Sequence, residues 1–268
     1  MDSHLKSEIK ARCVRLDIPI MGVASVDRWE DPPFLPWMPE EFYPESILPE
    51  ARSVIVLGLP ITLPILETTP SIHYHELYRT VNSILDQQGY LLSNMLNERG
   101  HPSIWIPRDG YGSLEVLKHN PIAFFSHRHA ALLAGLGTFG INNMLLTKEY
   151  GPRVRFVSVL TSAELPSDPI MEKELCIRCM RCVESCPTKA LIEGYYPQAL
   201  TIKDRCTAWS DSLHKKSTSP CGICIKVCPI GEDREFFGRS DPAIYKDERT
   251  PPRLKSAWEH VRSYGGLD

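Results

Sequence analysis

The chain has 268 residues, of which 43% are hydrophobic, and its 30 basic side chains nearly balance 33 acidic ones. It is long enough to bury one large core or two smaller ones, and its charge balance excludes a long-range field that would by itself attract nucleic acid or an anionic membrane. No apolar run approaches the roughly 20 residues that cross a bilayer, and residues 1–20 lack a secretion signal. We therefore expect a globular cytoplasmic protein without a membrane partner.

The first 165 residues show the hydrophobic periodicities of both helices and strands. The run at 54–57 is apolar throughout, which is typical of a strand buried on both faces, and the residues after 76 follow one face of a long amphipathic helix. In chain order we expect a helix over 5–16, a strand over 21–26, a strand over 54–57, a helix over 76–99, a strand over 104–106, a helix over 127–133, and two paired strands over 144–147 and 154–161.

A turn-rich link with two prolines follows at 165–169 and indicates a domain boundary near 165. We expect an α/β domain over 1–165, a cysteine-rich domain over 166–238 and a C-terminal tail over 239–268, with a short helix at 254–263. The remaining 39 residues after Pro229 are too few for a third domain.

The cysteines are distributed unevenly, because only Cys13 lies in the first 175 residues and eight lie in 176–228. Cys13 occupies an apolar helical position and is expected to be a core residue. Spacings as short as two residues in a reducing cytosol favour a shared metal over disulfides for the other eight.

Four of these cysteines read C-x2-C-x2-C-x3-C-P, a run that binds three corners of one [4Fe-4S] cubane and lends its fourth cysteine to a second cluster. A later C-x2-C-x3-C-P repeats the end of this run, and Cys206, fifteen residues before Cys221, replaces the missing first member. The crossed rule assigns Cys176, Cys179, Cys182 and Cys228 to one cluster and Cys186, Cys206, Cys221 and Cys224 to the other.

Zinc is the alternative for four-cysteine sites with C-x2-C pairs, but zinc does not call for the third close cysteine or the trailing Cys-Pro. Gly222 and Ser185 are small enough to let backbone N–H groups approach the sulfur atoms. Two adjacent clusters transfer single electrons and do no bond chemistry alone, so we expect the first domain to hold the acceptor.

The chain resembles the cobalamin-dependent iron-sulfur proteins that include epoxyqueuosine reductases and reductive dehalogenases. The resemblance is carried by the displaced Cys206, by segment 44–56, and by the AGLGTFG turn at 134–140 with 149–151 after it. It implies an α+β fold class, in which a cobalamin-processing or flavin-reductase-like α/β domain precedes a two-cluster ferredoxin-like domain and holds a corrin that the nearer cluster reduces. A flavin in place of the corrin stays open.

The glycine turn and the residues beside it are the candidate cofactor site. Missing side chains let a large cofactor approach the backbone, and hydroxyl and amide groups suit a corrin rim. Helix packing and turn capping explain the same residues equally well. The candidates are Gly135, Gly137, Thr138, Gly140, Asn142 and Asn143.

Four side chains are candidates for positioning a substrate or supplying a proton. His127, Arg128 and His129 lie just before the glycine turn, and Tyr74 lies near the start of the long helix. The alternative is that they are solvated polar residues on helices.

The chain also departs from these families. Epoxyqueuosine reductases carry a catalytic Asp shortly before the glycine turn, whereas this chain has no carboxylate between Glu115 and Glu149. Those enzymes continue into helical repeats that bind tRNA, whereas this chain stops soon after Pro229. We therefore expect neither epoxyqueuosine reduction nor a tRNA partner. Dehalogenase chemistry stays open but without support, because the nearest tyrosines, Tyr90 and Tyr111, cannot be aligned with the tyrosine of that branch.

These features together predict an iron-sulfur oxidoreductase. Two [4Fe-4S] clusters would relay single electrons to a bound cobalamin that reduces an unidentified substrate, and a ferredoxin or flavodoxin would donate the electrons. The alternative is an electron-transfer or reactivating protein that has no substrate of its own and docks on a corrinoid protein.

Overall fold

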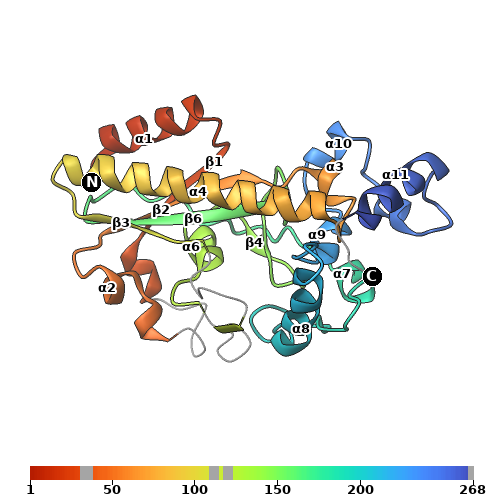
Figure 1. The fold of residues 1–268 in the computed structure, drawn as a ribbon. Coiled ribbons are helices and arrows are strands. Elements are labelled where there is room, and N and C mark those ends of the chain that lie inside the picture. The colour runs from red at the N-terminus through yellow and green to blue at the C-terminus, as the bar shows by residue number, and fades with distance from the viewer. Residues whose placement is uncertain (31–38, 109–114, 117–122, 265–268) are drawn as a thin grey trace.

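The protein combines helices with a central antiparallel sheet, which confirms the predicted mixture of helix and strand. The computed structural model describes residues 1–30, 39–108, 115–116 and 123–264 (Figure 1). The sheet has the strand order β1-β2-β6-β3. Its strands are β1 (Ile20–Ser25), β2 (Ser53–Pro60), β3 (Ser103–Ile106) and β6 (Val154–Thr161).

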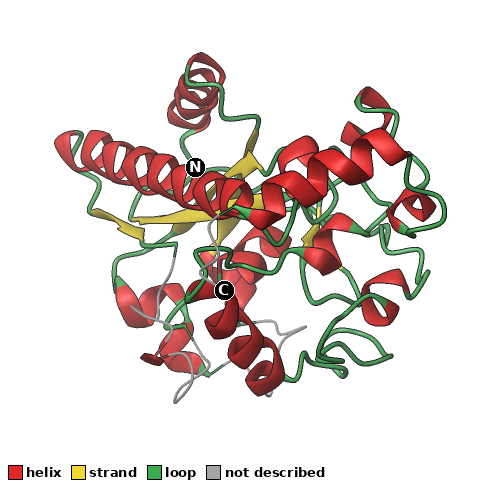
Figure 2. Ribbon diagram, turned by 45° about the vertical axis from the view of Figure 1, so that its right-hand side comes forward, coloured by secondary structure: helices red, strands yellow, loops and turns green. Residues whose placement is uncertain are grey.

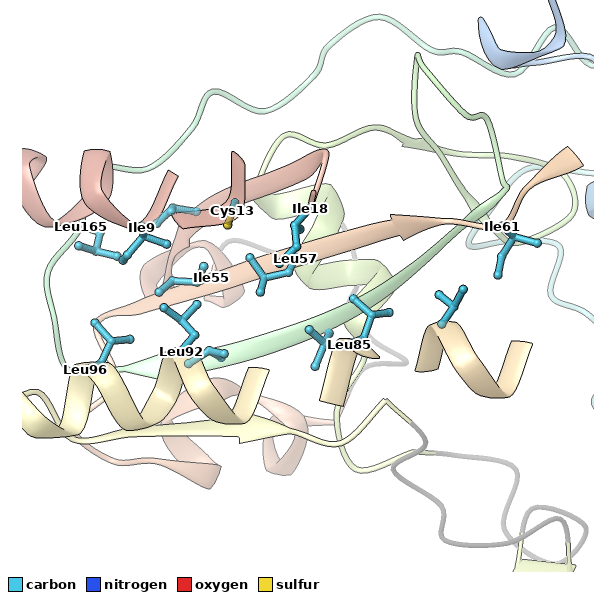
Figure 3. Close-up of a cluster of buried hydrophobic side chains, with 14 of the residues drawn as sticks. Ile9, Cys13, Ile18, Ile55, Leu57, Ile61, Leu85, Leu92, Leu96 and Leu165 are labelled. Carbon is cyan, nitrogen blue, oxygen red and sulfur yellow. The ribbon is translucent and has the colours of Figure 1, made fainter. Parts of the chain in front are cut away.

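Helices cover both faces of this sheet, and β2 supplies side chains to both cores. Ile55 and Leu57 pack against α1 (Ser3–Arg15) and α4 (Ile72–Glu98), as Figure 3 shows. Val54 and Val56 pack with α6 (His127–Leu133) on the other face. Burial on both faces of the sheet explains why residues 54–57 are all apolar, as predicted. Cys13 belongs to the first core and is 3% exposed, so the prediction of a core residue is confirmed.

The helix boundaries follow from local capping. The side chain of Asp2 accepts from the Leu5 N–H at the start of α1, and that of Ser71 accepts from the Tyr74 N–H at the start of α4. Helix α4 ends at Glu98, and Gly100 follows with a φ of 81°, a conformation that glycine adopts without steric cost.

One predicted pairing is wrong. The strand β5 (Leu145–Leu146) pairs with β4 (Thr138–Phe139) in a separate two-stranded sheet, and β6 pairs with β2 and β3 instead. Only an isolated bridge between Thr147 and Gly151 remains of the expected hairpin. The physical reason is that nearly all of β6 is buried, so it takes a central position in the larger sheet.

The cysteine region lies at one end of the sheet, beyond the N-terminal end of α4 (Figures 1 and 2). Its helices are short, and the chain between them is mostly irregular. They are α7 (Arg181–Glu184), α8 (Lys203–His214), α9 (Ile223–Lys226) and α10 (Asp233–Phe236), and α11 (Pro252–Ser263) follows in the tail.

The segment that leads into the cysteine region is bound to the first strand. Asp168 accepts from the Val23 N–H through its side chain and donates its own N–H to the Val23 carbonyl, and Lys6 forms an ion pair with Asp168 at 2.7 Å. The division into 1–165, 166–238 and 239–268 stays a prediction. Within the residues that the structure describes, no helix is both long enough and apolar enough to cross a membrane.

The other short elements lie on the sheet periphery or in the tail. They are η1 (Val26–Trp29), η2 (Glu40–Phe42), α2 (Pro44–Ile47), α3 (Leu63–Leu66) and η3 (Pro242–Tyr245).

Candidate metal centre

Four cysteines from two distant stretches of the chain line one small cavity. They are Cys176, Cys179, Cys182 and Cys228, the set that the crossed rule assigns to one cluster. Arg178 and Met180 adopt left-handed φ values of 55° and 58°, so the chain winds tightly between the first three thiols. Cys179 is exposed and Cys228 is buried, which places this cavity at the edge of the protein.

The other four cysteines also lie together, at the junction of α8 and α9. Cys206 lies near Cys221 and Cys186, and Cys224 lies near all three and also near Cys182 of the first set. Cys206 lies in the first turn of α8, so this helix takes up most of its long spacing from Cys221. These are the four cysteines predicted for the second cluster.

Buried thiols in both sets are costly to ionise without a metal. Burial, and secondarily the negative charge of Cys228, raises the pKa of Cys182 to about 12. Burial likewise raises the pKa of Cys228 to about 11 and raises the pKa of Cys224, with Cys221 adding to the effect. Iron binds cysteine as the thiolate, so a bound cluster would compensate for this desolvation and mutual repulsion.

Cys186 is the exception among the buried thiols. Burial raises its pKa, but N–H groups of Leu191, Thr188 and Ala190 point at the sulfur and leave the pKa below the ordinary value. The Ala190 nitrogen lies 3.3 Å from Cys186 Sγ. The donors expected from the sequence were Gly222 and Ser185, whereas these donors come from the turn that follows the Cys-Pro.

The donor set suits a cubane cluster, because four thiols surround a cavity and each iron of a cubane takes one ligand. In the described part of the chain, no group of three or more His, Cys, Asp or Glu side chains is arranged to hold a single metal ion.

Tyr74 does not face an open substrate pocket but lies buried beside the second cysteine set. It is 2% exposed. A Cβ atom on Gly222 would approach its ring to 2.6 Å, so Gly222 is required for this packing and for its own φ of 67°. Burial, and to a lesser degree Tyr78, raises the pKa of Tyr74. This buried phenol lacks the exposure expected of a residue that contacts substrate.

The glycine turn is filled by protein atoms. A Cβ atom on Gly135 would lie 2.0 Å from the Pro169 carbonyl oxygen, and one on Gly137 would lie 1.9 Å from that of Leu146. Gly140 borders the first cysteine cavity instead. Close packing within the protein therefore explains Gly135 and Gly137 without a cofactor.

The polar residues of the turn are also engaged within the protein. Asn143 accepts from the Thr201 N–H at 2.6 Å and donates to the Ala199 carbonyl at 3.1 Å, which joins the turn to the cysteine region. Thr138 accepts from the Leu175 N–H, and Asn142 accepts from the Met144 N–H. These bonds join the turn to the rest of the protein, and the cofactor role predicted for its residues stays a prediction.

The histidines and the arginine before the turn point in different directions. His127 contacts the Ser158 hydroxyl at 2.9 Å and the Pro107 carbonyl at 3.1 Å. His129 is buried, and its Nε2 lies 2.7 Å from the Tyr196 hydroxyl. Burial, followed by the charge of Arg128, holds the pKa of His129 well below its ordinary value, so this imidazole is neutral near pH 7.

Arg128 is partly exposed beside the buried His129 and donates to the Asn143 carbonyl. The structure therefore brings together Arg128, His129 and Asn143, and it separates Tyr74 from them, at the second cysteine set. The roles predicted for these side chains stay predictions.

Sequence reasoning missed three residues that the structure places at these sites. Tyr196 stacks on Phe139 with ring centroids 3.9 Å apart and hydrogen bonds with His129. Arg153 and Arg234 are almost fully buried and both bind the carbonyl oxygen of Cys228. No spacing rule connects these residues with the cysteine motif. The position of Arg234, six residues after Cys228, was the only local signal.

Residues 169–192 match the family of 4Fe-4S binding domains. The chain is 28% identical over 194 residues to the tetrachloroethene reductive dehalogenase of Desulfitobacterium hafniense, covering 66% of this chain and 32% of the relative. It is 26% identical over 244 residues to the epoxyqueuosine reductase of Synechococcus sp. strain RCC307, covering 85% of this chain and 71% of the relative. This chain thus matches about a third of the length of the dehalogenase.

The fold is also similar to that of a reductive dehalogenase whose structure suggests a mechanism for B12-dependent dehalogenation. The TM-score is 0.59 with 18% identity, covering 94% of this chain and 36% of the dehalogenase. At this identity the likeness concerns the fold alone. From the cysteine geometry, the 4Fe-4S match and the sequence relatives together, we conclude that the chain is an iron-sulfur homologue of the epoxyqueuosine reductases and reductive dehalogenases.

Proposed function

We propose that this protein is an oxidoreductase that relays single electrons through two [4Fe-4S] clusters to a bound cobalamin, which reduces a substrate. The observation that carries the proposal is the arrangement of the cysteines, because two interleaved sets of four lie in two adjacent groups. Cobalamin is the proposed acceptor because the fold is similar to that of a reductive dehalogenase for which a B12-dependent mechanism is suggested. When bound, it would supply the reductive bond chemistry that clusters alone do not perform.

The protein's own part in this function is to hold the relay. Each set combines one buried and one exposed cysteine, the first around a cavity at the edge of the protein and the second beside the buried Tyr74. One-electron transfer forms and breaks no protein bond, so rigid ligation and control of the potentials are what the fold must provide.

A second candidate is an electron-transfer or corrinoid-reactivating protein that docks on a corrinoid protein and has no substrate of its own. It is favoured by the glycine turn, where Gly135, Gly137 and Asn143 make their close contacts with the protein itself. A flavin acceptor in the first domain is the third candidate. Epoxyqueuosine reduction ranks below these because residues 116–148 contain no carboxylate to serve as the expected proton donor.

The deciding experiment is metal analysis and absorption spectroscopy of the protein purified without oxygen and incubated with cobalamin. Two cubanes require about eight irons per chain, and the Cys13→Ala variant is the matched control that should keep them. Stoichiometric cobalt in addition supports the cobalamin-dependent reductase. Eight irons without cobalt or flavin would reject the reductase in favour of the electron-transfer protein, and an iron-free protein would reject both.

A further inference from the structure

Two arginines from opposite sides of the cysteine region converge on Cys228, the ligand that completes the first cysteine set. Arg153 lies just before β6 and donates to the Cys228 carbonyl at 3.3 Å. Arg234 lies in α10 and donates to the same carbonyl at 2.7 Å. Their side chains are 0% and 1% exposed, so both guanidinium groups are within the protein interior.

The two arginines differ in how far their charge is neutralised. Arg153 forms a bidentate pair with Asp233, at 2.8 and 2.5 Å, and also donates to the Ile230 carbonyl. The Arg234 guanidinium donates to neutral oxygen atoms in the described part of the chain. These are the carbonyls of Cys228, Lys226 and Arg239 and the hydroxyl of Tyr245.

The nearest further carboxylate in this network is itself occupied. Glu67 is 3% exposed and accepts from Arg239 at 2.8 Å and from the Tyr245 hydroxyl at 2.8 Å. The two arginines and Asp233 therefore leave a net positive charge beside Cys228. A buried cation is costly unless an anion or hydrogen bonds compensate for its lost hydration.

A [4Fe-4S] cluster held by four thiolates is such an anion, and reduction adds one more negative charge to it. We propose that Arg153 and Arg234 are positioning residues that fix Cys228 and raise the reduction potential of the cluster it ligates, with Asp233 partly offsetting them. The proposal rests on the proposed function only in requiring that the cluster binds. An external one-electron donor reduces the cluster, which passes the same electron on, and no proton or bond is exchanged.

Both arginines are held firmly beside Cys228. The packing around them leaves little freedom, because a Cβ atom on Gly231 would lie 2.3 Å from the Arg153 guanidinium.

The test is a redox titration of the iron-loaded full chain, followed by electron paramagnetic resonance, with iron content measured on every sample. Arg234→Gln removes the buried charge and is expected to lower the reduced-to-oxidised ratio at a fixed potential by about tenfold, which corresponds to about 59 mV for a one-electron couple. Asp233→Asn removes the offsetting charge and should shift the potential in the opposite direction. Arg234→Lys should keep most of the wild-type potential.

Two further variants make the readout specific. Cys206→Ala removes a ligand of the other cluster and so identifies the signal that belongs to the Cys228 cluster. Arg99→Gln removes an arginine at the far end of α4, where it pairs with Glu8, and should leave both potentials unchanged.

An unchanged potential in Arg234→Gln at full iron content would overturn the proposal, and so would shifts of the same sign in Arg234→Gln and Asp233→Asn. If Arg234→Gln fails to hold the cluster, the decision rests on two other variants. The reduction potential must rise in Asp233→Asn and must stay close to the wild-type value in Arg234→Lys. A wild-type protein without iron would instead reject the proposed function itself, so the two failures are distinguishable.

Discussion

The cysteine region over 176–228 and the glycine turn over 134–140 were both predicted to hold a cofactor, but their side chains are arranged in opposite ways. The cysteines of the first set line a small cavity, and those of the second set lie close to one another. The turn residues contact protein atoms. A ligand site is thus recognised by side chains that converge without bonding to one another. In a packed turn, by contrast, the polar groups already bond to other protein atoms.

The largest expected effect comes from removing the most unusual ligand, Cys206. We expect Cys206→Ala to lose about half of the iron, four of about eight atoms, because the second cluster would keep only three thiolates. Iron and sulfide analysis of anaerobic protein measures this. Cys13→Ala, which deletes a buried thiol of the sheet core, is the control that should keep all the iron. Equal iron in Cys206→Ala and the wild type would remove Cys206 from the ligand set.

The next effect tests whether protein or cofactor fills the glycine turn. A Cβ atom on Gly137 would overlap the Leu146 carbonyl at 1.9 Å, so Gly137→Ala should lower the free energy of unfolding by about 3 kcal/mol or more, at the upper end of overpacking costs. Gly100→Ala is the control for a glycine without close neighbours, because its φ is 81° but nothing lies within 4 Å of the added Cβ atom, and it should cost about 1 kcal/mol.

Thermal denaturation of both glycine variants, with and without cobalamin, gives the comparison. Normal stability of Gly137→Ala together with lost cobalamin uptake would show that the turn is a cofactor cradle after all.

A smaller effect is expected at Asn143, which joins the turn to the cysteine region. Asn143→Ala leaves the Thr201 N–H and the Ala199 carbonyl without their partner, and each buried group left unsatisfied costs about 1–3 kcal/mol. The Asn142→Ala variant loses one hydrogen bond to the Met144 N–H and should be affected less. Urea denaturation ranks the two, and the opposite order would argue that Asn142, which borders the first cavity, has the larger structural role.

What the sequence could predict follows from the range of the interactions. Seven of the eight candidate cluster cysteines follow short spacings that bond geometry dictates, and the apolar run of β2 follows from burial on both faces, so both patterns were visible locally. The pairing of β5 with β4 was missed because turn residues at Gly151 and Pro152 report a local reversal but not which sheet each strand joins. A glycine in a sequence can make room either for a cofactor or for a backbone carbonyl of the protein. Only the structure shows that the Leu146 carbonyl occupies the space beside Gly137.

The two arginines at Cys228 also could not be predicted from local sequence patterns. Arg153 and Arg234 are 81 positions apart and meet only because the turn before β6 packs against the chain after Cys228. Charged residues are almost never fully buried unless they are paired, so the sequence favours a surface position for both. Their burial depends on long-range packing, which no local pattern reports.

The smallest expected effect tests whether His129 lies in a closed protein interior or beside an open pocket. The pKa of this histidine is depressed in the folded state, chiefly by burial, so below the ordinary value near 6.5 the unfolded chain binds a proton that the folded protein does not. The free energy of unfolding should therefore fall as pH drops from 7.5 to 5.5, by at most about 1.4 kcal/mol per pH unit. In His129→Asn this contribution is absent, so the fall should be shallower. Anaerobic thermal denaturation across this range measures the two slopes, and parallel slopes would mean that water reaches His129 and that the space beside Tyr196 is open to a ligand.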